Sequence, residues 1–165
     1  MLAFARPTQP QPVLVNPAGI LGAVRDLVLA DCDQQDIRVH LDCQGPMSFR
    51  ADASQVHQVV LNLVRNAVEA VGRGGNIQLR ARQATRRFGD EGQPGVVLEV
   101  EDDGPGIAPA VQQRLFDPFF STKAEGTGLG LAISARIVEG NGGVLEFESQ
   151  AGQGATFRIV FPSVP

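Results

Sequence analysis

The sequence predicts an α+β protein, a two-layer α/β sandwich in which helices cover one face of a mixed, mostly antiparallel sheet. Segments with the alternating apolar pattern of strands outnumber segments with helical spacing, and they come mostly as pairs. The strict alternation of strands with helices that a doubly wound parallel sheet needs is missing. With 165 residues, 43% of them hydrophobic, the chain is long enough for one domain with one core.

The first third of the chain is expected to contain a linker, a helix and three short strands. Residues 1–12 are rich in Pro and Gln, which is typical of a linker. A helix should begin at Asn16-Pro17, with Asn as the N-cap and Pro at the first helical position, and run to about Cys32. The strands are expected at Val13–Val15, Ile37–Leu41 and Met47–Arg50, the last two joined by a turn at Gln44-Gly45-Pro46.

The rest of the chain is expected to hold two more helices and two strand pairs. Asp52 suits the N-cap of the second helix, Gln55 completes a pattern like a capping box, and Gly72 should end this helix after Val71. The third helix is expected from Leu129 to Glu139. Strands are expected at Ile77–Ala81 and Val96–Val100, with a polar connection over 86–95, and at Val144–Glu148 and Thr156–Phe161, with a turn at Gly152 and Gly154.

Charge and composition exclude several classes of function. The net charge is −4, and the sequence lacks the basic stripe of a nucleic-acid-binding protein. Cys32 and Cys43 are too few for a disulfide framework or a zinc site, and we expect both to be reduced core residues of a cytoplasmic protein. No apolar run approaches the roughly 18 residues that span a membrane. Every basic residue is arginine except Lys123.

Two glycine-rich loops are the strongest functional signal in the sequence. The first is Asp102-Asp103-Gly104-Pro105-Gly106, and the second is Gly126-Thr127-Gly128-Leu129-Gly130. Glycine lets the backbone turn tightly or approach a ligand closely, and N–H groups at the start of a helix bind phosphate. Because the second loop runs into a predicted helix, the two loops together predict a nucleotide site.

The second predicted helix carries a polar stripe made mostly of amides. On a helical wheel Gln58, Asn62, Asn66 and Glu69 share one narrow face, and the opposite face is apolar, with Val56, Val60, Leu63, Ala67 and Ala70. A solvated surface is the alternative interpretation, but such surfaces are usually built from Lys, Glu and Arg, which favour helices more than Asn does. Next to the glycine loops, an amide stripe favours contact with phosphate or a metal ion.

These segments resemble the catalytic and ATP-binding domain of two-component sensor histidine kinases, most of all its nitrogen-regulation and oxygen-sensing branch. Four boxes in family order and spacing carry the resemblance, which covers about residues 13–163. They are the N box Asn62–Ala70, the first glycine box Asp102–Ile107, the F box Leu115–Lys123 and the second glycine box Gly126–Leu131. The resemblance implies the Bergerat ATP-binding fold of gyrase-, Hsp90- and MutL-type ATPases, which agrees with the predicted sandwich.

The resemblance also implies ATP and Mg²⁺ as ligands and a role for each box. Asn66 would ligate Mg²⁺, and Asn62 would lie beside the phosphates or the metal's waters. Asp102 would accept a hydrogen bond from the adenine amine, and residues 108–125 would form a mobile lid anchored by phenylalanines. The implied nucleotide contacts are Asn62, Asn66, Glu69, Asp102, Gly104, Gly106, Ile107, Phe119, Lys123, Gly126, Thr127, Gly128, Leu129, Gly130 and Leu131. Simpler roles remain open: Asp102 as a turn cap, Lys123 as an exposed lid residue and the phenylalanines as core.

The residue four positions before Asn66 favours a kinase over an ATPase. The ATPases of the superfamily carry a glutamate there as the general base for water, whereas this chain has Asn62, which cannot act as a base. A kinase needs mainly positioning and charge neutralisation, because its nucleophile is a histidine supplied from elsewhere. Neither His40, in a predicted strand, nor His57, which faces away from the asparagines, fits the acceptor of the family.

The chain is therefore expected to be the catalytic domain alone. Residues 1–12 are assigned to a linker with a remnant of the dimerisation helix, because Leu2–Pro7 resembles its end, and residues 13–163 to the catalytic domain. The expected partners are ATP, the dimerisation and phosphoacceptor domain of the same kinase, and the receiver domain of a response regulator. By itself the chain should be a monomer that binds nucleotide in the cytoplasm, whether or not the full-length kinase is membrane-anchored. An anti-sigma-factor-type serine kinase and a regulatory nucleotide-binding module on the same fold are the alternatives.

Overall fold

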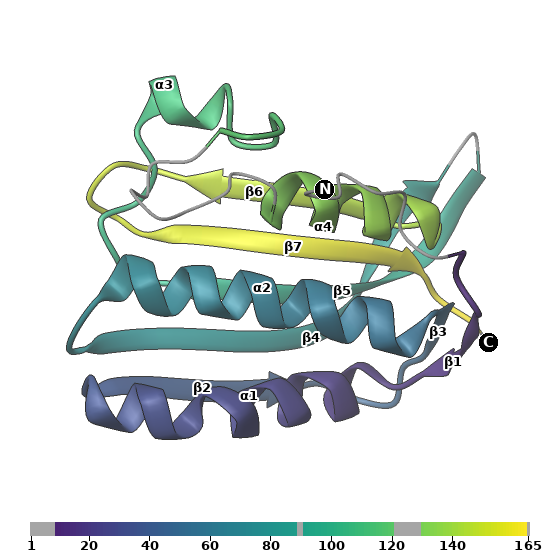
Figure 1. Cartoon of the computed structure of the whole chain (residues 1–165). Coiled ribbons are helices and arrows are strands. Elements are labelled where there is room, and N and C mark those ends of the chain that lie inside the picture. Colours follow the sequence, from purple (N-terminus) through teal and green to yellow (C-terminus); the bar gives the residue numbers. More distant parts are fainter. Residues whose placement is uncertain (1–8, 89–90, 121–129, 165) are drawn as a thin grey trace.

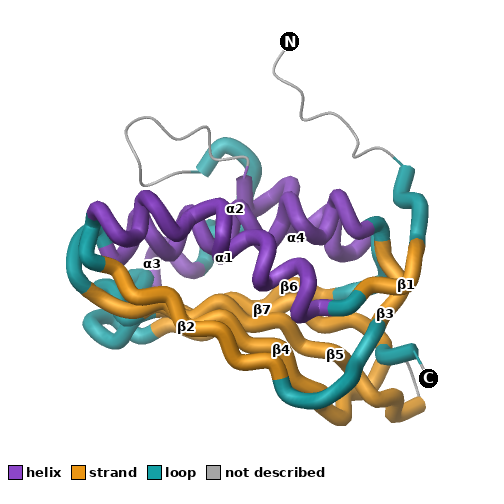
Figure 2. Tube along the Cα trace, turned by 90° about the horizontal axis from the view of Figure 1, so that it is seen from below, coloured by secondary structure: helices purple, strands orange, loops and turns teal. Residues whose placement is uncertain are grey.

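A computed structural model describes residues 9–88, 91–120 and 130–164. Helices cover one face of a five-stranded sheet, and the other face carries no helix among these residues (Figure 2). The strand order is β2-β4-β5-β7-β6, and only β2 and β4 run parallel. The two-layer, mostly antiparallel sandwich expected from the sequence is confirmed.

The first two helices begin, and the second ends, where the capping residues predict, whereas the first runs two residues past the predicted end at Cys32. Helix α1 (Pro17–Gln34) starts after Asn16, whose side chain accepts a hydrogen bond from the Ala18 N–H at 3.0 Å. Helix α2 (Ala53–Val71) starts after Asp52, which accepts from the Gln55 N–H at 3.1 Å. It ends at Gly72, whose φ of 73° suits glycine. Helix α4 is Gly130–Gly140, and α2 lies between α1 and α4 (Figure 1).

The main sheet consists of long central strands and shorter outer ones. They are β2 (Ile37–Cys43), β4 (Gly75–Phe88), β5 (Glu91–Asp102), β6 (Val144–Ser149) and β7 (Ala155–Pro162). Residues 86–95 were expected to be a polar connection, but residues 86–88 belong to β4 and residues 91–95 to β5, and the two strands pair as far as Phe88 and Glu91. A two-stranded ribbon that extends beyond the core needs no apolar alternation, so the sequence pattern did not reveal it.

The expected pairing of the two strands after α1 is wrong. Strand β2 pairs with β4, whereas β3 (Phe49–Ala51) pairs with β1 (Val13–Val15) in a separate two-stranded sheet. The residue after β2 still bonds to β4, because the Gln44 N–H donates to the Ala81 carbonyl at 3.1 Å. Residues 44–46 therefore do not form a hairpin turn. The small sheet closes one end of the core, because the fully buried Phe49 stacks on Phe161 with ring centroids 4.5 Å apart.

The core lies between the helices and the covered face of the sheet. On α2, four of the five residues of the predicted apolar face are buried, but Ala70 is exposed because it lies in the last turn. Val59 and Val64 are buried as well, so the apolar face is wider than expected. No helix within the described residues is both long and apolar enough to cross a bilayer.

The face of the sheet opposite the helices carries a charged cluster around Glu99. The Glu99 side chain is only 7% exposed and accepts hydrogen bonds from Arg82 at 2.8 Å and from Arg158 at 2.9 Å. Arg80 pairs with Glu101 and lies 3.7 Å from Glu99. Burial alone would raise the pKa of Glu99, but the hydrogen bonds from Arg82 and Arg158 outweigh it and lower the pKa.

Candidate functional site

Three segments that are distant in sequence meet at the exposed side of α2: α2 itself, the loop after β5 and the first turn of α4. A Cβ atom on Gly130 would lie 3.0 Å from the Asn62 Oδ1, so the start of α4 rests on that asparagine. The Asn62 Nδ2 also donates to the Ser134 hydroxyl at 3.2 Å. At the other end, a Cβ atom on Gly104 would lie 3.0 Å from the Ala70 carbonyl oxygen. The predicted glycine loop therefore adjoins the C-terminal end of α2, and the end of the predicted phosphate loop adjoins the amide stripe at Asn62.

Asp102, the last residue of β5, is the buried carboxylate of this site. Its side chain lies below the surface at 7% exposure, and its Oδ1 accepts a hydrogen bond from the Gly104 N–H at 2.9 Å. Burial raises the pKa of Asp102, although hydrogen bonds from the Gly104 and Ala155 backbone N–H groups oppose that shift. A buried carboxylate held by backbone donors is oriented before any ligand arrives. The Gly104 contact also fits the turn-cap role, so the two interpretations of Asp102 are compatible.

The neighbouring carboxylate, Asp103, is exposed and already engaged. It accepts hydrogen bonds from the Asn76 backbone N–H at 2.8 Å and from the Asn76 Nδ2 at 3.0 Å. These bonds, the backbone one first, lower the pKa of Asp103. A Cβ atom on Gly75 would come within 2.7 Å of the Asp103 Oδ1. Asp103 therefore anchors the loop to the start of β4, and Asp102 is the residue of the pair that suits ligand recognition.

The amide stripe places oxygen donors along one side of α2. Asn62 and Asn66 are half-buried one turn apart, and Glu69 is exposed almost one turn further along. Amide and carboxylate oxygens are the ligands that Mg²⁺ prefers, and this ion keeps several of its waters. Among the described residues, no group of three or more His, Cys, Asp or Glu could hold a metal. The amide and carboxylate oxygens of the stripe fit a hard cation that keeps several of its waters.

The start of the predicted lid is ordered against the core. It contains a short helix, α3 (Pro109–Gln112), which the sequence pattern did not reveal. Phe116 packs edge-on against Phe147 at 5.5 Å, so it is an anchor, and the Arg114 guanidinium lies 4.7 Å from the Phe120 ring centroid. Phe119, by contrast, is 66% exposed with a φ of 66°. Its predicted nucleotide contact stays a prediction.

Part of the predicted site lies outside the described residues. Lys123, Gly126, Thr127, Gly128 and Leu129 fall in the segment 121–129. Gly130 is the first residue of α4 and is exposed, while Leu131 is half-buried and packs against the core. Of the predicted second glycine loop, the structure thus describes only its junction with α4.

Contacts between the first glycine loop and the turn joining β6 to β7 were not predicted. The Ser149 hydroxyl accepts from the Ile107 N–H at 2.8 Å and donates to the Gly154 carbonyl at 2.9 Å. Gln112 donates from Nε2 to the carbonyls of Ile107 at 2.8 Å and Ser149 at 3.1 Å. The only sequence signal for this contact is the glycine pair at 152 and 154, which was interpreted as a simple hairpin turn.

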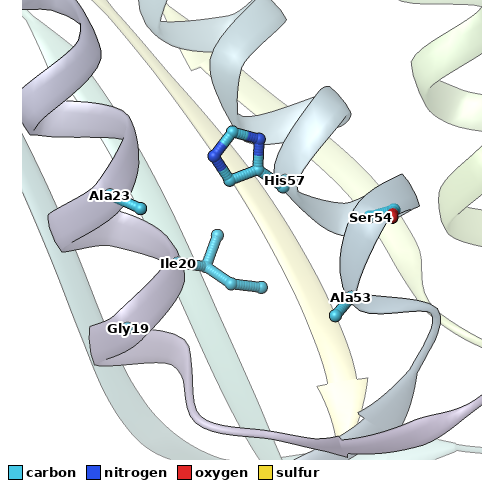
Figure 3. A pocket seen from close by; sticks show the side chains of 6 residues that line it. All are labelled: Gly19, Ile20, Ala23, Ala53, Ser54 and His57. Atoms are coloured by element: carbon cyan, nitrogen blue, oxygen red, sulfur yellow. The ribbon is translucent and has the colours of Figure 1, made fainter.

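An open pocket between α1 and α2 is separate from this site. Figure 3 shows the His57 side chain pointing from α2 toward Ile20 and Ala23 of α1. Gly19, Ala53 and Ser54 complete the lining, and none of these six residues belongs to the predicted site. His57 thus faces away from Asn62 and Asn66, as expected.

Comparison with known proteins connects these features to one group of signalling proteins. Residues 51–165 match the model of the family described as histidine kinase-, DNA gyrase B-, and HSP90-like ATPases. The sensor histidine kinase ZraS of Salmonella typhimurium is 34% identical over 165 residues, which are 99% of this chain and 34% of ZraS. The sensory histidine kinase/phosphatase NtrB of Rhizobium meliloti is 39% identical over 135 residues, 77% of this chain and 35% of NtrB. The chain thus spans about a third of the length of these curated relatives.

Solved structures show the same arrangement of elements. The nucleotide-free catalytic domain of the histidine kinase ThkA aligns with a TM-score of 0.79 and 28% identity, over 94% of this chain and 99% of that one. ThkA in complex with the response regulator protein TrrA aligns with a TM-score of 0.76 and 26% identity, over 94% of this chain and 43% of that one. The fold described above is therefore the fold of a histidine kinase catalytic domain.

Proposed function

This chain belongs to the family of histidine kinase-, DNA gyrase B- and HSP90-like ATPases, and we propose that it is the catalytic domain of a sensor histidine kinase. It binds Mg-ATP and transfers the γ-phosphoryl group to a histidine on a separate dimerisation domain. The observation that carries this proposal is that α2 is contacted by both loops, by the Asp102 glycine loop at its C-terminal end and by the start of α4 at Asn62. Sensor histidine kinases among the relatives support it.

Asp102 recognises the adenine base in this proposal. Its carboxylate is buried and oriented by backbone N–H donors, so it can accept a hydrogen bond from the exocyclic amine without rearranging. A guanine carries an oxygen at the same position, which would face the carboxylate as a second acceptor. ATP should therefore bind better than GTP. Gly104, Gly106 and Ile107 form the loop next to the base.

Asn66 and Asn62 lie where the phosphates and Mg²⁺ would be held. Asn66 would supply an amide oxygen to Mg²⁺, and this ion would neutralise phosphate charge during transfer. Asn62 supports the first turn of α4 through Gly130 and Ser134, so the helix N-terminus is oriented toward the phosphates. Lys123 and the residues from Gly126 to Leu131, with Glu69 and Phe119, complete the proposed contact set.

Asn62 also supports a kinase over an ATPase. Its side chain is an amide, which cannot take a proton from water, and its Nδ2 is occupied by Ser134. The next carboxylate of the stripe, Glu69, lies two turns further along α2 and is exposed. Positioning and charge neutralisation suffice when the nucleophile is a histidine from another domain. No observation favours the serine kinase or the purely regulatory module.

The partners follow from the same proposal. The phosphoacceptor is the dimerisation domain of the same kinase, because His40 on β2 pairs with Asn76 and His57 lies in the α1–α2 pocket, so neither contacts the asparagine stripe. ThkA forms a complex with the response regulator TrrA, which supports a receiver domain as the next partner. We assign residues 13–163 to the catalytic domain and residues 1–12 to the linker that leads to the dimerisation domain.

The test is a titration of the chain with ATP and GTP, with and without Mg²⁺, followed by addition of the dimerisation domain. We expect ATP-selective binding that Mg²⁺ strengthens, negligible hydrolysis, and phosphorylation of the added domain. Rapid hydrolysis without an acceptor would contradict the kinase assignment. Binding of neither nucleotide would contradict the proposal as a whole.

A further inference from the structure

We infer that Ser149 and Gln112 are positioning residues that hold the first glycine loop against the β6–β7 turn and thereby set the adenine selectivity of Asp102. This inference rests on the proposed function, because it concerns the same nucleotide site. Neither residue belongs to the four boxes that carried the sequence resemblance, and neither is proposed to touch the nucleotide.

The Ser149 hydroxyl acts as a hydrogen-bond acceptor and as a hydrogen-bond donor at the same time. It accepts from the Ile107 N–H at 2.8 Å and donates to the Gly154 carbonyl at 2.9 Å. The hydroxyl therefore connects the last residue of the glycine loop to the residue before β7. An alanine at this position would leave one backbone donor and one backbone acceptor without these bonds, and such groups are costly when they are shielded from water.

Gln112 connects α3, at the start of the predicted lid, to the same junction. Its Nε2 donates to the carbonyls of Ile107 and Ser149, at 2.8 and 3.1 Å. Because Gln112 is the last residue of α3, one amide group ties that helix to the loop and to the turn together. A change in the position of α3 is therefore transmitted to the loop through Ile107.

The backbone around this junction leaves little space for movement. The Gly152 N–H donates to the Pro105 carbonyl at 2.6 Å. A Cβ atom on Gly106 would lie 2.2 Å from the Gln150 carbonyl oxygen, and one on Gly154 would lie 2.0 Å from the Asp102 carbonyl oxygen. Loop and turn thus pack backbone to backbone, and the side chains of Ser149 and Gln112 determine how they meet.

This packing affects nucleotide binding through the orientation of the Asp102 carboxylate. Its carboxylate accepts from the Gly104 N–H, on the loop, and Asp102 itself pairs in register with Ala155, directly after the turn. If the loop and the turn separate, Gly104 moves relative to the strand pair of Asp102 and Ala155, and the carboxylate loses its fixed orientation. Selectivity for the adenine amine then falls, whereas contacts to the phosphates, on the other side of the site, do not change.

The experiment compares ATP with inosine triphosphate, which carries an oxo group in place of the adenine amine. Binding of each nucleotide to the chain is measured by calorimetric titration with Mg²⁺, and thermal unfolding is followed without nucleotide. Ser149→Ala removes the hydroxyl, Ser149→Thr retains it, and Gln112→Glu removes both N–H donors at constant size. Matched controls are Ser54→Ala, in the first turn of α2, and Gln113→Glu, an exposed neighbour of Gln112 with the same change of charge.

We expect Ser149→Ala and Gln112→Glu to weaken ATP binding by about tenfold, the effect of losing one or two hydrogen bonds, with little change for inosine triphosphate. Ser149→Thr and both controls should retain the selectivity of the unmodified chain. Variants that lose thermal stability but keep the ratio of ATP to inosine triphosphate affinity would overturn the inference and leave the proposed function intact. An unmodified chain that binds no ATP would instead overturn the proposed function. If Ser149→Ala does not fold, Gln112→Glu and its control decide alone.

Discussion

Alanine substitutions at two glycines of the β6–β7 turn separate two costs in the free energy of unfolding. One is backbone strain, and the other is the steric clash of a side chain with Asp102. Gly152 and Gly154 have nearly the same φ, 82° and 80°. An alanine in this left-handed region costs about 1–2 kcal/mol wherever it stands. The surroundings differ, because a Cβ atom on Gly152 would meet nothing within 4 Å, whereas one on Gly154 would lie 2.0 Å from the Asp102 carbonyl oxygen.

The additional cost of Gly154→Ala comes from moving backbone. The new methyl group would collide with the main-chain carbonyl oxygen of Asp102, at the end of β5. Asp102 is fixed by its pairing with Ala155, so no side-chain rotation can relieve the collision. Inserting a methyl group into packed structure typically costs about 1–3 kcal/mol. We therefore expect Gly154→Ala to lower the free energy of unfolding by about 2–5 kcal/mol and Gly152→Ala by about 1–2 kcal/mol.

The assay is urea unfolding of both variants beside the unmodified chain, followed by ATP titration of the folded proteins. Gly154→Ala should also weaken ATP binding, because the displaced carbonyl belongs to Asp102 itself. Gly152→Ala should bind ATP normally, since its N–H can still donate to the Pro105 carbonyl. Equal losses of stability in the two variants would refute the reasoning, because strain alone would then account for both.

Three further predictions concern single side chains. Asn66→Ala should abolish the Mg²⁺-dependent part of ATP binding and leave binding in EDTA unchanged; equal titrations of variant and unmodified chain in Mg²⁺ would remove the metal role. Asp102→Asn should weaken ATP binding by about 1.5–3 kcal/mol, the scale of a charge-assisted hydrogen bond. Because burial raises the pKa of Asp102 in the folded chain, the free energy of unfolding contains a contribution that is lost as pH rises through that pKa. Urea unfolding from pH 4 to 7 should show this loss in the unmodified chain and not in Asp102→Asn. Glu99→Gln should cost about 2–3 kcal/mol, less than a fully buried pair because its arginines are partly exposed. The pKa of Glu99 is lowered, so this stability is lost as pH falls through that pKa, and ATP titration should be unaffected on the opposite face of the sheet.

Local features of the fold could be predicted from the sequence, whereas strand partners could not. Asn16, Asp52 and Gly72 act on backbone within a few residues, so their sequence context is sufficient. The parallel pairing of β2 with β4 requires α2 to cross between them, and nothing in residues 37–43 encodes that partner. The polar ribbon over 86–95 was missed because alternation is visible only where one face of a strand is buried.

The same distinction applies to the site. The prediction placed Asp102, Asn62 and Gly130 at one nucleotide site, and the structure brings the last two into contact and buries the first. Ser149 and Gln112 were missed, because serine and glutamine are common surface residues and their partners are backbone atoms far away in the sequence. Such contacts depend on how a turn meets a loop, and no spacing of residues encodes that.

The two outer strands of the main sheet affect how separate copies of the chain meet. In the order β2-β4-β5-β7-β6, both β2 and β6 have a strand partner on one side only within the described part of the chain, and a free strand edge is a template for further strands. On β6, Glu146 and Glu148 alternate with the inward-packed Leu145 and Phe147. Glu148 pairs with Arg158 of β7 at 2.9 Å, so a second β6 edge would meet charged side chains that are already engaged. This edge thus carries charges that oppose growth of the sheet from one molecule into the next, which favours solubility of the chain at high concentration.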